Sequence, residues 1–319
     1  MSFFQPAPGA VLSHDIADYP DGIVLPIDKP YRWTSADVIR KVKFAAFRHF
    51  RKKNLKVGHA GTLDPLATGV LLVCIGPACK RAQEFQDHDK EYVAGIRFGA
   101  TTPSYDLEKE VDRTFPYDRV TEEAVRAVLP SFLGPQEQVA PLFSAKSVDG
   151  VRAYEMARKL YRNAQKGILD PDFDAAALET LHRSRITISE LELLDYVEAS
   201  AGPDKSACGA SANGVGQNFF DLFSGEKILV REVTADAQDT VKSASSRINV
   251  ADTSSLGLPE ARIRIACSKG TYIRAFARDL GEALGTGAHL SGLVRTKTGA
   301  FRLEDALSLE EALDLLASD

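Results

Sequence analysis

Residues 58–69 read Gly-His-Ala-Gly-Thr-Leu-Asp-Pro-Leu-Ala-Thr-Gly, and the apolar run Gly69 to Ile75 follows directly. The glycines and the proline predict a loop at the start of this stretch. The proline biases the preceding residue, Asp64, toward an extended backbone. Two interpretations of Asp64 are open. It caps a helix that begins at Pro65, which is the more common role of an Asp-Pro pair, or it is a functional carboxylate.

A second segment, residues 267–274, reads Cys-Ser-Lys-Gly-Thr-Tyr-Ile-Arg. It combines the end of a predicted strand, a glycine turn and the start of a predicted helix, and it carries two cations and a tyrosine. The alternative interpretation is a surface turn whose basic side chains are solvated. Neither segment identifies a reaction by itself.

The composition is that of a soluble globular chain. Of 319 residues, 44% are hydrophobic and 26% are charged, which suits one large domain or two medium ones. The sequence has no apolar run of the roughly eighteen residues that a membrane-spanning helix needs. Residues 1–20 hold three prolines and neither Lys nor Arg, unlike a secretory signal or a transit peptide, so we expect a cytoplasmic protein.

The cysteines argue against both a disulfide framework and a zinc site. The chain has four cysteines without a Cys-x-x-Cys pair, and its six histidines do not cluster with them. We therefore expect reduced thiols and no metal.

The formal net charge of -5 hides an uneven distribution. Residues 38–60 hold eight cations and no acid, and residues 261–302 hold eight cations against two acids. Two interpretations are open: both segments converge on one surface that binds a polyanion, or they are two separate solvated faces.

Hydrophobic periodicity predicts alternating strands and helices without a strict βαβ order, so we expect the α+β class. Thr34 or Ser35 is a candidate N-cap for the first long helix, and Ser308 with Glu311 forms a capping box. The predicted strands are Gly22–Asp28, Tyr92–Phe98, Ile186–Leu194 and Ala261–Ala266, and the predicted helices are Ala36–Phe50, Thr121–Leu129, Val151–Leu160, Gly270–Leu284 and a short one after Ser308.

The segment 197–259 is rich in Ala, Ser, Gly, Asn and Asp and holds one clear apolar run, at residues 227–233. A polar segment of this length inside a compact domain is typical of an insertion, and we expect a mobile or small accessory element. The predicted organisation is an N-terminal extension (1–22), one domain formed by 23–196 and 260–319, and the insertion between its two parts.

Several ordered motifs resemble the bacterial tRNA pseudouridine synthases of the TruB family. The resemblance covers residues 24–196 and 262–316. It is most specific over the twelve consecutive positions 58–69. The other matching residues are Asp28-Lys29-Pro30, Thr34-Ser35, Lys90-Glu91-Tyr92, Gly99 to Thr102 with Asp106, Gln138, Pro141, Ser144 to Lys146, Gly150, Ala153-Tyr154, Cys267 to Arg274, His289-Leu290, Leu293 and Arg295.

The resemblance implies a pseudouridine synthase fold, with a central, mostly antiparallel sheet flanked by helices and loops. It implies an isomerase, without cofactor or metal, that converts the T-loop uridine at tRNA position 55 to pseudouridine. The expected partner is the T-arm of tRNA, without a membrane and without a guide RNA, and we expect a monomer. Family members usually continue into a PUA-like domain, which we do not expect in this chain.

The resemblance also implies roles for individual residues. Asp64 is the catalytic carboxylate, Arg274 pairs with it, and Tyr92 stacks on the target base near the proton that leaves C5. Leu293 packs on the other side of the base and Tyr272 lines the pocket. His59 enters the T-loop where the flipped nucleotide had been stacked. Lys29 and Arg295 are assigned to RNA binding, and for Lys29 a structural role is an open alternative.

Three positions depart from the family pattern. Val294 stands where many members have a second arginine, and Ser184 stands where an arginine is expected, between Arg183 and Arg185. The stretch 146–183, which corresponds to a mobile thumb over the T-loop, is longer than usual.

Three other functions are alternatives to this one. The first is a guide-dependent pseudouridine synthase of the dyskerin type, which shares the aspartate motif. The second is an RNA-folding module that has lost the chemistry. The third is a glycosidase that uses Asp64 and Asp106 as a carboxylate pair.

Overall fold

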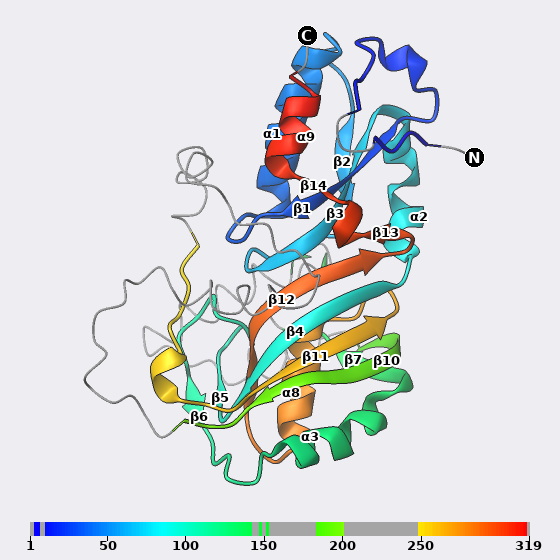
Figure 1. Cartoon of the computed structure of the whole chain (residues 1–319). Helices are drawn as coiled ribbons and strands as arrows, with labels where there is room; N and C mark the ends of the chain where they lie inside the picture. Colours follow the sequence, from blue (N-terminus) through cyan, green and yellow to red (C-terminus); the bar gives the residue numbers. More distant parts are fainter. Residues whose placement is uncertain are drawn as a thin grey trace.

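The fold is built on one mixed sheet. The computed structural model describes residues 3–6, 10–141, 147–148, 151–152, 183–200 and 248–317. The sheet has ten strands in the order β14-β1-β3-β12-β4-β11-β10-β7, with β2 added to β3 and β13 to β12 (Figure 1). The strands are β1 Ile23–Lys29, β2 Val57–Ala60, β3 Ala67–Ile75, β4 Lys90–Phe98, β7 Gly134–Val139, β10 Arg183–Val197, β11 Glu260–Cys267, β12 Ala288–Thr298, β13 Phe301–Arg302 and β14 Leu307–Ser308.

Most neighbouring strands are antiparallel. The exceptions are β1 with β14 and β12 with β3, which are parallel. Together with the separate helices, this confirms the predicted α+β class and the mostly antiparallel sheet.

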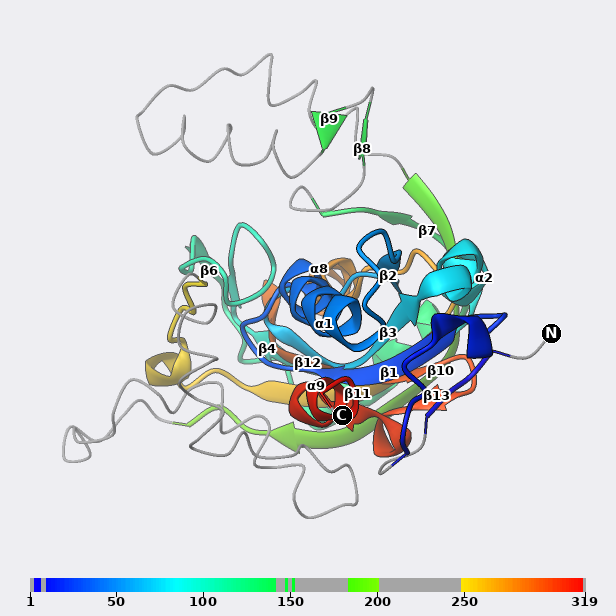
Figure 2. The same ribbon diagram turned by 90° about the horizontal axis from the view of Figure 1, so that it is seen from above.

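Helices cover the sheet on both faces. In Figure 2, α1 (Ser35–His49) and α8 (Ile273–Ala283) lie on the same side of the sheet. Every helix within the described ranges is too short or too polar to cross a bilayer. The remaining elements are α2 Ala82–Asp87, α3 Glu122–Val128, α9 Leu309–Leu315, the short 3-10 helices Ile16–Asp18, Gly76–Arg81, Leu129–Phe132, Ser254–Leu256 and Leu303–Asp305, and the short strands β5 Ala100–Thr101, β6 Arg113–Thr114, β8 Ser147–Val148 and β9 Val151–Arg152.

Strand β3 is the centre of the core. All nine of its residues are buried. Leu71 and Val73 belong to the larger apolar cluster, whereas Val70 and Leu72 belong to a second cluster. Because successive side chains of a strand point to opposite faces, β3 is covered on both sides, as its continuous apolar sequence predicts.

The parallel pair of β12 and β3 joins the upper part of the sheet (β14, β1, β3 and β2) to the lower part (β12 to β7) (Figure 1). Leu293 lies opposite Ala67, and Arg295 lies opposite Gly69. Gly69 has φ +98°, and a Cβ there would lie 2.2 Å from the carbonyl oxygen of Arg295. Only glycine therefore allows this close approach.

Most of the predicted elements are confirmed, with small shifts at their ends. The predicted helix Gly270–Leu284 begins at Ile273, because Gly270 has φ +80° and Tyr272 is extended at the N-cap. The predicted helix Val151–Leu160 is wrong at its first two residues, which pair as a strand with β8, and the rest lies outside the described residues. Residues 201–247 of the predicted insertion and most of the predicted thumb also lie outside them.

Helix α1 begins with a capping box. The Asp37 backbone N–H donates to Thr34 Oγ1 at 3.1 Å, and the Thr34 backbone N–H donates to the Asp37 carboxylate at 3.2 Å. Both bonds satisfy amides that the first turn of a helix leaves without partners.

We predict that Thr34→Ala lowers the free energy of unfolding by about 1 kcal/mol, because the cap of α1 is lost. Thr34→Ser keeps the hydroxyl and is the matched control. Urea unfolding followed by circular dichroism measures both variants. Equal stability of the alanine and serine variants would contradict the capping role.

Candidate active site

Asp64 lies in the loop between β2 and β3, in front of a turn and not at the start of a helix. The backbone N–H of Ala67 donates to the Asp64 carbonyl at 3.1 Å, and the chain then enters β3. The hydroxyl of Ser35, at the start of α1, bonds both the N–H and the carbonyl of Leu63, each at 3.0 Å. The helix-cap interpretation of Asp64 is therefore wrong, and α1 fixes the residue that precedes the carboxylate.

Lys29 supports this loop from inside the protein. Its side chain is fully buried, and Nζ donates to the carbonyls of Trp33 at 2.6 Å, Pro30 at 2.9 Å and Pro65 at 3.2 Å. Burial lowers the pKa of Lys29 to about 7, and the nearby carboxylates of Asp64 and Asp28 oppose that shift.

Arg295 supports the other side of the loop. Its side chain is 1% exposed, and its guanidinium donates to the carbonyls of Val70 at 2.7 Å, Gly61 at 3.2 Å and Thr62 at 3.5 Å. Backbone carbonyls thus offset the cost of burying the cation. Both side chains are buried against the backbone and hold the loop, which favours the structural alternative for Lys29. The predicted RNA-binding role of the two residues remains a prediction.

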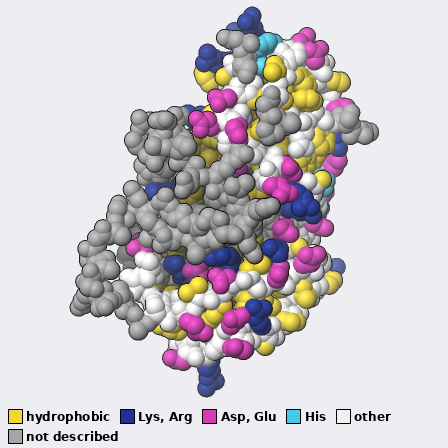
Figure 3. Space-filling model, in the orientation of Figure 1, with side chains coloured by type: hydrophobic (Ala, Val, Ile, Leu, Met, Phe, Trp, Pro, Cys, Tyr) yellow, Lys and Arg dark blue, Asp and Glu magenta, His cyan; other side chains and the backbone are white. Residues whose placement is uncertain are grey.

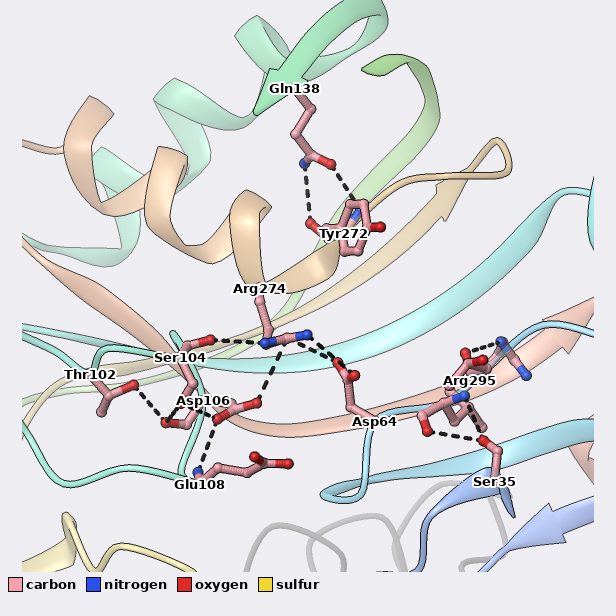
Figure 4. A network of polar contacts seen from close by, with 12 residues as sticks. Ser35, Asp64, Thr102, Ser104, Asp106, Glu108, Gln138, Tyr272, Arg274 and Arg295 are labelled. Atoms are coloured by element: carbon pink, nitrogen blue, oxygen red, sulfur yellow. Dashed lines mark hydrogen bonds and ion pairs between the residues drawn. The ribbon is translucent and has the colours of Figure 1, made fainter. Parts of the chain in front are cut away.

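Arg274 forms the ion pair expected with Asp64. It lies in the first turn of α8, its side chain is 7% exposed, and Nε lies 2.9 Å from Asp64 Oδ2. A second nitrogen donates to Asp64 Oδ1 at 3.3 Å, so the contact is bidentate (Figure 4). The Asp64 side chain is 40% exposed, so it meets solvent on one side and the guanidinium on the other.

Asp106 is the site residue that the sequence reasoning did not place. Its carboxylate lies 3.7 Å from Arg274 Nε, on the same guanidinium as Asp64 (Figure 4). The Ser104 hydroxyl donates to Asp106 Oδ1 at 2.6 Å, and the Glu108 backbone N–H donates to the same oxygen at 2.9 Å. Two features of the sequence pointed to Asp106: its place in a matching motif, and the alternative in which it forms a carboxylate pair with Asp64.

The shared guanidinium bears on the glycosidase interpretation. A glycosidase needs its two carboxyl groups on opposite sides of a sugar, one as the acid and one as the base or nucleophile. Here Arg274 lies against both Asp64 and Asp106 and compensates their charge. The arrangement therefore supports an arginine held by two carboxylates and not a sugar-cleaving pair.

A small recess that is open to solvent lies in front of this network. Leu293, on β12, is 8% exposed and forms part of its apolar wall. The residues that line the recess are Asp64, Leu66, Ala67, Asp106, Leu107, Arg274, Leu290, Ser291, Gly292 and Leu293.

Tyr92 and Tyr272 lie close to the recess without belonging to its lining. Tyr92, on β4, is 8% exposed and pairs with Arg295 across the strands. Burial raises the pKa of its phenol. The backbone of Tyr272 exchanges two hydrogen bonds with the side-chain amide of Gln138, at 2.8 and 3.1 Å, which holds the start of α8 (Figure 4). Their predicted contacts with a base remain predictions.

His59, on β2, is half-buried. Its Nδ1 has no hydrogen-bond partner within the described part of the chain. Burial and the neighbouring Arg295 lower the pKa of the imidazole, which favours the neutral form. Its predicted role in RNA binding remains a prediction.

The end of the predicted insertion contacts the rim of the recess. Arg32 donates through its guanidinium to the Ile248 carbonyl at 2.6 Å and through its backbone N–H to the Pro65 carbonyl at 2.9 Å. The Ala251 N–H donates to the Leu107 carbonyl at 2.8 Å. Residues near the end of the predicted insertion therefore brace both loops that flank the recess.

The two residues that depart from the family pattern both lie within paired strands of the sheet. Val294, where an arginine was expected, is fully buried between β3 and β4. Ser184 pairs with Gln138 across β10 and β7. Within the described residues, no cluster of three or more His, Cys, Asp or Glu side chains has an arrangement that could hold a metal ion.

Comparison with known proteins gives further evidence on the family of this chain. Residues 48–167 match the model of the TruB family pseudouridylate synthase N-terminal domain, and residues 274–319 match that of the tRNA pseudouridylate synthase B C-terminal domain. The chain is 41% identical to the tRNA pseudouridine synthase B of Phocaeicola vulgatus over 293 residues, which is 92% of each chain. It is 42% identical to that of Bacteroides thetaiotaomicron, again over 293 residues and 92% of each chain.

Among solved structures, the chain is similar to one in a Cbf5-Nop10-Gar1 complex, with a TM-score of 0.49 and 22% sequence identity. The match covers 92% of this chain and 54% of that chain.

We predict a pH dependence of stability from Glu108. Burial and the charge of Asp106 raise the pKa of Glu108 to about 7 from an ordinary value of 4.5. Between these two values the folded protein keeps a proton that the unfolded chain has lost, so stability falls as the pH rises through this window. Glu108→Gln is expected to flatten that fall.

Urea midpoints between pH 4 and pH 8 measure this effect. The exposed Glu110 lies two positions further along the chain, and Glu110→Gln is the matched control. The interpretation is refuted if Glu108→Gln and wild type lose stability in parallel across the window.

Proposed function

From the premise that this chain belongs to the TruB family of pseudouridylate synthases, we propose that it converts the T-loop uridine of tRNA, at position 55, to pseudouridine, with Asp64 as the catalytic carboxylate. The chain is accordingly an isomerase. The observation that carries the assignment of the residue is the ion pair of Asp64 and Arg274 at an open recess. Relatives that cover nearly the whole chain are named tRNA pseudouridine synthase B, which supports tRNA as the substrate.

The reaction explains why one oriented carboxylate is needed. It breaks the bond between C1' of the ribose and N1 of the base, turns the base, and rejoins it through C5, after which a proton leaves C5. A carboxylate that captures the intermediate, at C6 of the base or at C1' of the sugar, keeps the reacting fragments together meanwhile. Asp64 suits either route because its carboxylate is partly open to the recess.

The arginine gives the carboxylate its orientation. The bidentate contact fixes the plane of the Asp64 carboxylate, and Asp106 fixes the guanidinium from the other side. A buried guanidinium is stable only with such partners, since an unpaired buried charge is costly. We infer that Asp106 acts through Arg274 as a positioning residue.

In this proposal, apolar and aromatic side chains contact both faces of the target uracil. Leu293 packs on one side of the uracil ring, and Tyr92 stacks on the other side and stands near C5. The high pKa of the Tyr92 phenol keeps it protonated near neutral pH. His59 fills the gap in the T-loop that the flipped nucleotide leaves, and its neutral imidazole suits stacking on bases.

The proposal includes the conditions under which the enzyme acts. We propose that it works on tRNA as a monomer in the cytoplasm, without a guide RNA. The names of its bacterial relatives refer to tRNA, whereas the similar solved chain belongs to a complex with other proteins.

The first test is the modification of an unmodified tRNA transcript by purified protein. We expect pseudouridine at position 55 without added guide RNA, and we expect Asp64→Asn to lower the rate by on the order of 10³-fold or more. Binding of tRNA by Asp64→Asn and its urea midpoint are the controls for folding. Product only with guide RNA and partner proteins would support the dyskerin type, and binding without product in wild type would support an RNA-folding module.

The second test concerns Asp106. Asp106→Asn keeps the shape of the side chain and removes the charge that holds Arg274. We expect kcat to fall by roughly 10²-fold, with a much smaller change in KM, because a slightly misplaced catalytic group loses about that much. Asp112→Asn, at an exposed position nearby, is the control. An unchanged kcat in Asp106→Asn would show that Asp64 alone orients the arginine.

A further inference from the structure

Helix α1 presents an unusual outward face. Its buried side is formed by Val38, Val42, Ala46 and His49. The opposite side carries what we call the α1 outer stripe, which consists of the exposed residues Arg40, Lys43, Phe44 and Arg48 together with Phe47, which is half-buried and also packs against the apolar core. These residues recur at the spacing of three and four that places side chains on one face of a helix.

Phe44 is the residue that the fold does not explain. It is 65% exposed, the most exposed aromatic side chain among the described residues. The tip of Arg48 lies 5.9 Å from the centre of its ring, and Lys43 Nζ lies 5.4 Å from the centre of the Phe47 ring. The stripe therefore alternates aromatic faces with cations that lie against them.

The stripe is strongly basic. Arg40 forms an ion pair with Asp37, and it is the only member of the stripe with an ion pair among the described residues. No acid occurs from Val38 to Ala60, and Arg51, Lys52 and Lys53 continue the positive charge beyond the helix end. In Figure 3, Lys and Arg side chains occupy the upper tip of the molecule, where α1 ends in Figure 1.

The stripe lies at a defined distance from the recess. Ser35, the first residue of α1, holds the loop of Asp64. At a rise of about 1.5 Å per residue, the segment from Lys43 to Arg48 lies about 12 to 20 Å further along the helix axis. That corresponds to about four to six base-pair steps of a nucleic-acid helix.

These observations favour RNA as the occupant. A positively charged groove or face with exposed aromatic rings is the arrangement that binds unpaired bases and their phosphates. Paired bases, such as those of a tRNA stem, cannot stack on Phe44, because each is covered by its neighbours. The partner of Phe44 is therefore an unpaired base.

We propose that the α1 outer stripe is a second RNA-binding surface, which contacts tRNA outside the T-arm. Phe44 stacks on an unpaired base, and Lys43 and Arg48 contact the adjacent phosphates. This inference rests on the proposed function, since it assumes that the T-loop occupies the recess. It adds to that function a means of distinguishing a whole tRNA from an isolated T-arm hairpin.

The test compares two substrates, a full-length tRNA transcript and a T-arm hairpin with the same loop. Phe44→Ala is expected to lower kcat/KM for tRNA by about 5- to 150-fold, the range for one lost stack, and to leave the hairpin unchanged. Phe44→Tyr keeps the aromatic face and should behave as wild type, whereas Phe44→Leu should behave as the alanine variant.

The second part of the experiment removes two positive charges of the stripe. Lys43→Ala/Arg48→Ala should reduce the slope of log K against log salt for tRNA binding by about 1.4 to 1.8, as expected for two lost phosphate contacts. Arg119→Ala/Arg302→Ala removes two exposed cations elsewhere and is the control. The slope of the control should equal that of wild type.

The outcomes separate this inference from the function on which it rests. If wild type modifies neither substrate, the proposed function fails. If wild type modifies both and the stripe variants match it on tRNA, only the stripe proposal is overturned. Equal losses on tRNA and hairpin would also overturn it, as would stripe variants that lose binding to anionic lipid vesicles while their tRNA kinetics stay unchanged.

Discussion

Three buried basic side chains converge on the loop that carries Asp64, and the site depends on them. Lys29 and Arg295 bind the loop through its backbone carbonyls, and Arg274 binds the carboxylate itself. Each charge would be costly in the interior without these partners. The loop is therefore held from three directions, although two glycines give its sequence unusual backbone freedom.

The two parts of the sheet contribute different components of the site. Asp64 enters from the upper part through the loop before β3, whereas Arg274 and Leu293 come from the lower part. The parallel contact of β12 with β3 brings them together. Stability and chemistry are thus joined at one place, because the strand pairing that completes the core also sets the distance between carboxylate and guanidinium.

The sequence predicted the strands and helices well where the hydrophobic pattern was strong, as in β3, α1 and β11. It located Asp64 and Arg274 through an ordered series of motifs. It left the role of Lys29 open and did not show that Arg295 is buried, because a sequence displays a cation but not the carbonyls that surround it after folding. It also did not place Asp106, whose contact with Arg274 depends on how the loop after β5 folds back on α8. Residues 201–247 offer no periodic pattern from which a structure could be predicted.

Gly69 packs so closely against the backbone of Arg295 that no side chain fits between β3 and β12. Any side chain would have to displace the neighbouring backbone by more than an ångström, since ordinary contacts of a Cβ begin at 3.4 Å and the available gap is 2.2 Å. Such a displacement would move Arg295 off the loop and widen the space between the acid and its arginine. The absence of a side chain at Gly69 therefore sets the geometry of the site, although Gly69 does not line the recess.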